Sequence, residues 1–121
     1  MTGNIARASL LAFFMAAAAP GLAQAGSAYD GSWSLTINTQ RGTCDPSYYF
    51  QVQIANGIVS HANLVKFRGR VAPSGFVRVS VSAGGKTAAG AGRLTHTAGG
   101  GRWTGRSGGD HCSGTWTAQK M

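Results

Sequence analysis

Apolar and polar side chains alternate along most of the chain, which is the pattern of β-strands with one face buried. In residues 33–38, Trp33, Leu35 and Ile37 alternate with polar neighbours, and residues 48–54 repeat the pattern. After residue 26 no stretch repeats its apolar residues with the 3.6-residue period of an amphipathic helix. The pattern therefore predicts an all-β chain.

Turns rich in glycine divide this pattern into eight short strands, because glycine readily adopts the positive φ that tight hairpins need. Asn56-Gly57 is the strongest of these signals, and a two-residue turn there starts a strand over residues 58–62 and places Val52 opposite His61. A short loop is expected at residues 63–66. The remaining turns are predicted at residues 73–75, 84–85, 97–101 and 108–109.

The turn lengths also fix which residues face each other across neighbouring strands. A three-residue turn at residues 73–75 pairs Val71 with Val77, and the same register pairs Arg70 with Arg78. Large residues then meet small ones across the last strands, as a filled interior requires. These pairs are Val79 with Gly90, Val77 with Gly92, Trp103 with Gly114, and Cys112 with Gly105.

The start of the chain has the order of a secretory signal peptide. Arg7 precedes an apolar run over residues 8–19, and Ala23-Gln24-Ala25 supplies the small residues that signal peptidase reads. The run is too short to span a bilayer, which disfavours a membrane anchor. We therefore expect cleavage near Ala25, which leaves one monomeric domain of residues 26–121 without a transmembrane segment, in the periplasm or secreted.

In an exported chain, the two cysteines predict one disulfide between Cys44 and Cys112. In an eight-stranded meander the last strand runs antiparallel to the first. Cys112 opens the last strand, and Cys44 lies a few residues past the first. The bond would clasp the seam of a closed β-barrel and stabilise it by about 4 kcal/mol. An open two-sheet sandwich also brings the cysteines together, so closure is the favoured alternative of two.

Charge argues against catalysis. The chain carries a formal net charge of +8 and contains no glutamate. Asp30, Asp45 and Asp110 are its only carboxylate side chains, which leaves almost no pair for acid and base catalysis. In Asp110-His111-Cys112, neighbours on a strand point to opposite faces, and a disulfide removes the thiolate. We expect no enzyme activity, no cofactor and no metal.

The arginines carry the leading functional hypothesis. If the apolar face points inward, six of them point outward from four neighbouring strands, with Arg70 directly across from Arg78 and Phe76 nearby. Facing like charges cost stability unless an anion neutralises them, and guanidinium groups suit phosphate, sulfate and carboxylate. The candidate anion-binding residues are Arg68, Arg70, Arg78, Arg93 and Arg106, with Arg102 on the same face.

Several ligands fit a basic surface of this kind. We expect an anionic polysaccharide or lipopolysaccharide, and a protein partner is a further alternative. Nucleic acid is disfavoured because the chain is exported and because few outward aromatic residues are available for base stacking. A solvated surface that is basic but holds no specific ligand is the alternative to all of these.

The interior offers a second candidate site. Trp33, Trp103 and Trp116 alternate with glycines, which predicts either a packed core or a cavity for a small apolar ligand. His61 is expected at the mouth of the barrel, and Tyr48 and Tyr49 near its rim. His96 and His111 are expected in a loop and on the surface.

Two short motifs resemble known families. Gly31-Ser32-Trp33 resembles the Gly-x-Trp signature of the calycin barrels (lipocalins, avidins and bacterial inhibitors of secreted metalloproteases), with Lys120 as counterpart of the basic residue that packs over the tryptophan. The second and third lipocalin motifs and an avidin biotin site are missing. The resemblance implies a protease inhibitor or small-ligand carrier as the alternative function. Asp30-Gly31-Ser32-Trp33 and Cys112-Ser113-Gly114-Thr115-Trp116 resemble small exported alphaproteobacterial proteins without an assigned activity.

Overall fold

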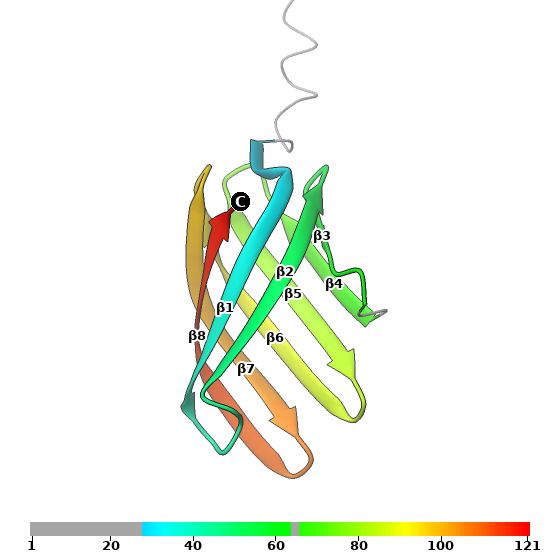
Figure 1. Cartoon of the computed structure of the whole chain (residues 1–121), viewed down its shortest axis with the longest axis vertical. Coiled ribbons are helices and arrows are strands. Elements are labelled where there is room, and N and C mark those ends of the chain that lie inside the picture. Colours follow the sequence, from blue (N-terminus) through cyan, green and yellow to red (C-terminus); the bar gives the residue numbers. More distant parts are fainter. Residues whose placement is uncertain (1–27, 64–65) are drawn as a thin grey trace, which may run out of the picture.

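The computed structural model describes residues 28–63 and 66–121, and in them eight antiparallel strands close into a barrel in which β8 pairs with β1 (Figure 1). This confirms the closed meander and excludes the open sandwich. The predicted signal peptide lies outside the described residues. The strands are β1 (Gly31–Arg41), β2 (Ser47–Ala55), β3 (Ile58–Ser60), β4 (Lys66–Val71), β5 (Phe76–Ala83), β6 (Lys86–Leu94), β7 (Ala98–Ser107) and β8 (Asp110–Lys120).

The predicted registers next to the tight turns are confirmed, apart from one pair that lies beyond the end of the β2–β3 ladder. Asn56 and Gly57 adopt φ values of 53° and 76°, as a two-residue hairpin turn requires. The carboxylate of Asp30 accepts the backbone N–H of Asn56 at 3.0 Å and so fixes this turn to the start of β1. The predicted pairing of Arg70 with Arg78 across β4 and β5 is also present.

Two boundaries were predicted wrongly on either side of the short strand β3. The β2–β3 ladder ends at the pair Gln53–Ser60, so the predicted pairing of Val52 with His61 is not part of it. The reason is a local turn, in which the backbone N–H of Asn63 donates to Nδ1 of His61 at 3.1 Å. Lys66, expected in the following loop, is the first residue of β4, and residues 64–65 lie outside the described residues.

The glycine run at residues 99–101 was predicted as a turn, and it belongs to β7 instead. The β6–β7 turn occupies residues 95–97, where the N–H of Thr95 donates to the carbonyl of Ala98 at 2.7 Å. A Cβ atom added to Gly101 would overlap the carbonyl oxygen of Ala91 and lie 2.7 Å from Cα of Gly92. These glycines therefore serve close packing between strands.

The predicted disulfide joins Cys44 and Cys112, with 6.1 Å between their Cα atoms. It ties the β1–β2 loop to the start of β8, beside the register shift between Thr39 and Arg41 in the β1–β8 ladder. The backbone N–H of Cys44 also donates to Sγ of Cys112 at 3.2 Å. The bond therefore clasps the seam of the barrel, as the sequence predicts.

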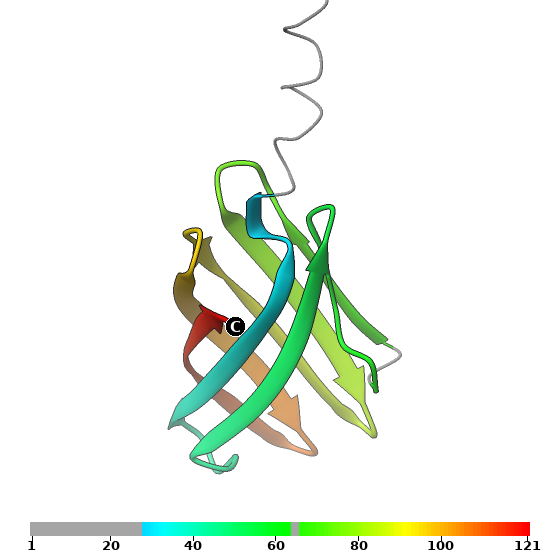
Figure 2. The same ribbon diagram turned by 45° about the horizontal axis from the view of Figure 1, so that its top comes forward.

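The barrel has two ends, which we name the Tyr29 end and the Cys44 end (top and bottom of Figure 1). The C-terminus and the β2–β3, β4–β5 and β6–β7 turns gather at the Tyr29 end (Figure 2). The side chain of Tyr29 is buried there and donates its hydroxyl to the carbonyl of Pro73 at 3.2 Å. None of the described residues forms a helix long and apolar enough to cross a membrane.

Candidate functional site

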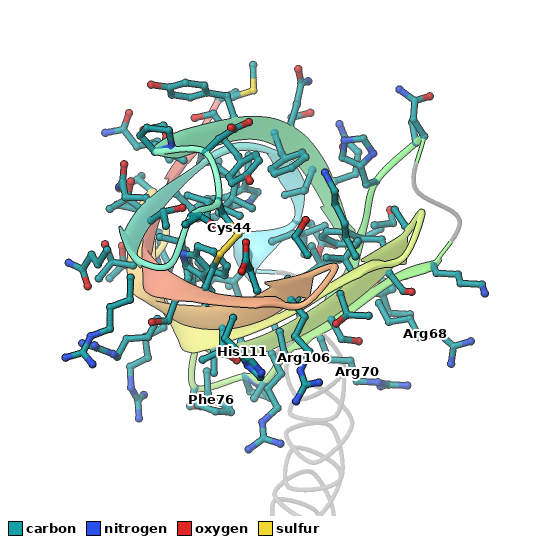
Figure 3. All side chains as sticks on the ribbon, turned by 90° about the horizontal axis from the view of Figure 1, so that it is seen from below. Cys44, Arg68, Arg70, Phe76, Arg106 and His111 are labelled. Carbon is teal, nitrogen blue, oxygen red and sulfur yellow. A yellow bond between two sulfur atoms is a disulfide. The ribbon has the colours of Figure 1, made fainter. Side chains whose placement is uncertain are left out.

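The six arginines predicted to point outward are all exposed: Arg68, Arg70, Arg78, Arg93, Arg102 and Arg106. Figure 3 shows Arg68, Arg70 and Arg106 projecting from one side of the barrel, away from its interior. Their positions follow from strand geometry, because alternate residues of a strand point to opposite faces and the apolar alternates point inward. One wall of the barrel therefore presents most of the positive charge.

The register of β4 to β7 arranges these arginines around a floor of short side chains. In one row across the sheet, Arg70, Arg78 and Arg102 surround Ala91. In the next row, Arg68 on β4 is followed across the sheet by the short side chains of Ser80, Ala89 and Thr104. In the third row, Lys66 and Arg106 lie on either side of Ser82 and Thr87. Since β4 and β7 are three inter-strand steps apart, their cations are about 14 Å apart, whereas Arg78 on β5 is about 10 Å from Arg102.

The short floor makes this wall concave. Two hollows share Arg68, Ser80, Ala89 and Thr104 and so form one continuous groove. Among the described residues that line it, none is acidic. We call it the basic groove, and its cationic side chains are Arg41, Lys66, Arg68, Arg70, Arg78, Arg102 and Arg106, with His111 at its β8 side.

Arg93 does not line the groove. It lies opposite Phe76 across β5 and β6, beyond the row that contains Arg78. Phe76 remains partly exposed, and the guanidinium of Arg78 lies 5.7 Å from the centre of its ring, within the range of a cation–π contact. Lys66 was missed because it was placed in a loop, whereas the alternation from Arg68 back by two residues already assigns it the outward face.

The three tryptophans of the interior are hydrogen-bonded to the backbone of the barrel. Trp33 is only 1% exposed, and its indole N–H donates to the carbonyl of Tyr29 at 2.8 Å. The indole N–H of Trp103 donates to Asn38 O at 3.0 Å, and that of Trp116 donates to Ala91 O at 3.3 Å. Because each indole N–H has a backbone partner, these residues pack the barrel without needing a ligand.

The same tryptophans also border an interior cavity of about 90 Å³ with apolar walls. The packed core and the cavity, which the sequence left as alternatives, are therefore both present. Towards the Cys44 end lies a further hollow of about 280 Å³, which we call the mouth. Ile37, Val81, Ala88 and Trp103 line both, so the cavity continues into the mouth.

The remaining predicted site residues lie around this end. His61 lies in the wall, with its ring 5.9 Å from that of Phe50 and 6.1 Å from that of Phe67, and does not line the cavity or the mouth. Tyr48 lines the mouth and accepts the N–H of Asp45 at 3.1 Å. Tyr49 points outward and is 76% exposed.

The described residues hold no group of three or more histidine, cysteine, aspartate or glutamate side chains that would bind a metal ion. His96 and His111 are both exposed. Lys120 pairs with Trp33 across β1 and β8, and a Cβ atom added to Gly31 would lie 3.0 Å from the side chain of Lys120.

Comparisons with family models, curated proteins and solved structures found no match for this chain. The calycin resemblance therefore stays a prediction.

Proposed function

We propose that this protein is an exported, non-catalytic binding module whose basic groove holds an anionic polymer of the cell envelope or extracellular space. The observation that carries the proposal is the arrangement of cations on both sides of a floor of short side chains. A basic surface that binds no specific ligand would not require a concave floor of short side chains between its cations. A groove of this shape brings several guanidinium groups to bear on a ligand that lies along it.

The chemistry of the groove suits phosphate, sulfate or carboxylate groups. Guanidinium groups donate paired hydrogen bonds to such oxygens, and the hydroxyls of Ser80 and Thr104 on the floor add neutral donors. Along β4, Arg68 and Arg70 are about 6.6 Å apart, so one ligand meets cations repeatedly. A bound anion would also relieve the repulsion between Arg70 and Arg78.

Charge reversal tests this proposal. In the double variant Arg70→Glu/Arg78→Glu, affinity for heparin and for lipopolysaccharide is expected to fall about tenfold or more, because two guanidinium contacts become repulsive. The control variant Arg93→Glu/Lys120→Glu changes net charge equally but lies outside the groove, and its affinity is expected to stay within about threefold of the parent protein. Equal losses in both variants, or no loss in the first, would overturn the proposal.

A second candidate function, a carrier of a small apolar ligand, is favoured by the cavity beside Trp103 and Trp116. It belongs to the alternative that the calycin resemblance implies, and the protease inhibitor in that alternative has no comparable structural support. A carrier predicts that apolar ligands change tryptophan fluorescence in a saturable way. Fluorescence that no apolar ligand alters would remove this candidate.

A further inference from the structure

The basic groove and the mouth of the barrel adjoin each other. Five residues near the Cys44 ends of β5, β6 and β7 line both: Val81, Thr87, Ala88, Gly105 and Arg106. Ala88 pairs with Val81 on one side and with Gly105 on the other. One layer of sheet with small side chains therefore separates the groove from the mouth.

The interior suits only an apolar group. The lining side chains are apolar, and the indole N–H groups of Trp103 and Trp116 are already bonded to backbone carbonyls. Among the described residues no buried side-chain polar atom lacks a hydrogen-bond partner. A polar ligand group that entered would lose its hydration without gaining a hydrogen bond, whereas an alkyl group would gain from leaving water.

The dimensions favour a flexible chain over a ring system. The interior cavity of about 90 Å³ is smaller than the ~150 Å³ cavity that accepts benzene and far below a drug-sized pocket of ~300 Å³. The mouth, at about 280 Å³, continues outward from it. A narrow apolar space that widens towards solvent fits the end of an alkyl chain.

The rim of the mouth is cationic. Lys86 and Arg106 line it and are exposed, and no acidic residue is among the described residues of its lining. We propose that the protein binds a single-chain anionic amphiphile, with its alkyl chain in the mouth and cavity and its anionic group at Lys86 and Arg106, where the basic groove begins. This inference rests on the proposed function and names an alkyl chain as part of the ligand.

Binding of dodecyl phosphate below its micelle concentration tests this inference by tryptophan fluorescence and calorimetry. Two probes separate chain from charge: ethyl phosphate lacks the chain, and dodecyl maltoside lacks the charge. Dodecyl phosphate is expected to bind at least about tenfold more tightly than either probe, because it both buries methylene groups and pairs its phosphate with Lys86 and Arg106. Equal affinity for dodecyl phosphate and ethyl phosphate, or for dodecyl phosphate and dodecyl maltoside, would overturn the inference.

Variants locate the two parts of the ligand. Ile37→Phe adds bulk where the cavity meets the mouth, at a residue that does not line the basic groove, and is expected to weaken binding of dodecyl phosphate about fivefold or more, while heparin binding stays unchanged. If that variant fails to fold, Gly90→Ala serves instead, because its added Cβ atom would lie 3.5 Å from its nearest neighbours. Lys86→Gln/Arg106→Gln is expected to lower the affinity for dodecyl phosphate but not the affinity for dodecyl maltoside. Arg93→Gln removes an exposed positive charge elsewhere and serves as the control.

The outcomes distinguish this inference from the proposed function. If heparin binds through the groove but dodecyl phosphate binds no better than ethyl phosphate, the inference is wrong and the proposed function stands. If neither heparin nor dodecyl phosphate binds, both are wrong. Binding to vesicles of anionic phospholipid without binding to monomeric dodecyl phosphate would indicate adsorption to a surface, and would also overturn the inference.

Discussion

The two ends of the barrel are made from the same strands and differ in how their inward side chains pack. On β5, Val77 lies towards the Tyr29 end and is 4% exposed, whereas Val79 and Val81, further towards the Cys44 end, are only half-buried. The Tyr29 end holds fully buried side chains such as Trp33 and Leu94, which border the interior cavity. At the Cys44 end the cavity widens into the mouth between the strands.

The difference arises from which residues meet across the strands. Near Trp116, glycines at 92 and 101 let the strands and the indole ring approach closely. Near the Cys44 end, Ala88 lies between Val81 and Gly105, and these small side chains leave the mouth bordered by Trp103. Buried side chains thus close the Tyr29 end, whereas a disulfide ties the Cys44 end, where the mouth opens.

Removing the disulfide is expected to give the largest effect on this comparison. Cys44→Ser/Cys112→Ser should lower the free energy of unfolding by about 4 kcal/mol, because the bond closes a long loop in the unfolded chain. Urea unfolding followed by tryptophan fluorescence measures the change. A loss below about 1 kcal/mol would mean that packing already closes the Cys44 end.

Two glycines on β6 provide a matched pair of substitutions. In Gly92→Ala the added Cβ atom would overlap the carbonyl oxygen of Gly100 and lie 2.7 Å from Cζ2 of Trp116, so we expect a loss of about 2–3 kcal/mol. In Gly90→Ala the nearest atoms are 3.5 Å away and the new methyl group faces the cavity, so we expect a gain of about 0.5 kcal/mol. Thermal unfolding measures the stability of both variants. Equal losses of stability would contradict the proposed difference in packing.

Truncating valines on β5 tests the same difference with one residue type. Val77→Ala should cost about 2 kcal/mol, because its side chain is fully buried at the Tyr29 end. Val81→Ala should cost less than about 1 kcal/mol, because its side chain is only half-buried and borders the open mouth, which Val77 does not. Denaturant midpoints give both values, and a reversed order would show that the Cys44 end is the better packed one.

The smallest effect concerns the outer wall. Arg70 faces Arg78 directly, so Arg70→Glu should stabilise the ligand-free protein by a few tenths of a kcal/mol at low salt. Towards the Cys44 end, Arg106 faces Thr87 and His111, so Arg106→Glu should bring a smaller gain. Unfolding at low and high salt measures both, and a gain from Arg70→Glu that salt does not reduce would exclude charge repulsion as its cause.

Much of the fold could be predicted from the sequence because tight turns fix register. Asn56-Gly57 and Gly84-Gly85 allow only one alignment of their strands, so the facing pairs follow by counting residues. The prediction failed where glycine had another purpose. Residues 99–101 were assigned to a turn although packing against β6 requires them to be glycine, and nothing in a single sequence distinguishes the two uses.

The outward direction of the arginines was also predictable, because alternation alone determines it. The concavity of the basic groove was not, since it depends on Ser80, Ala89 and Thr104 lying side by side on three strands. The sequence could not predict the interior cavity for a related reason. Whether Trp103 and Trp116 fill the interior depends on volumes and rotamers that strand patterning does not specify.

A backbone amide NMR titration of the protein with heparin, at low and near-physiological salt, tests the central claim most directly. If the basic groove recognises anions, the shifts will be confined to the residues that line the groove, will spare Arg93, and will persist at near-physiological salt. Shifts that spread over the whole surface, or that vanish as salt is raised, would contradict the claim and leave the arginines as solvated surface charge.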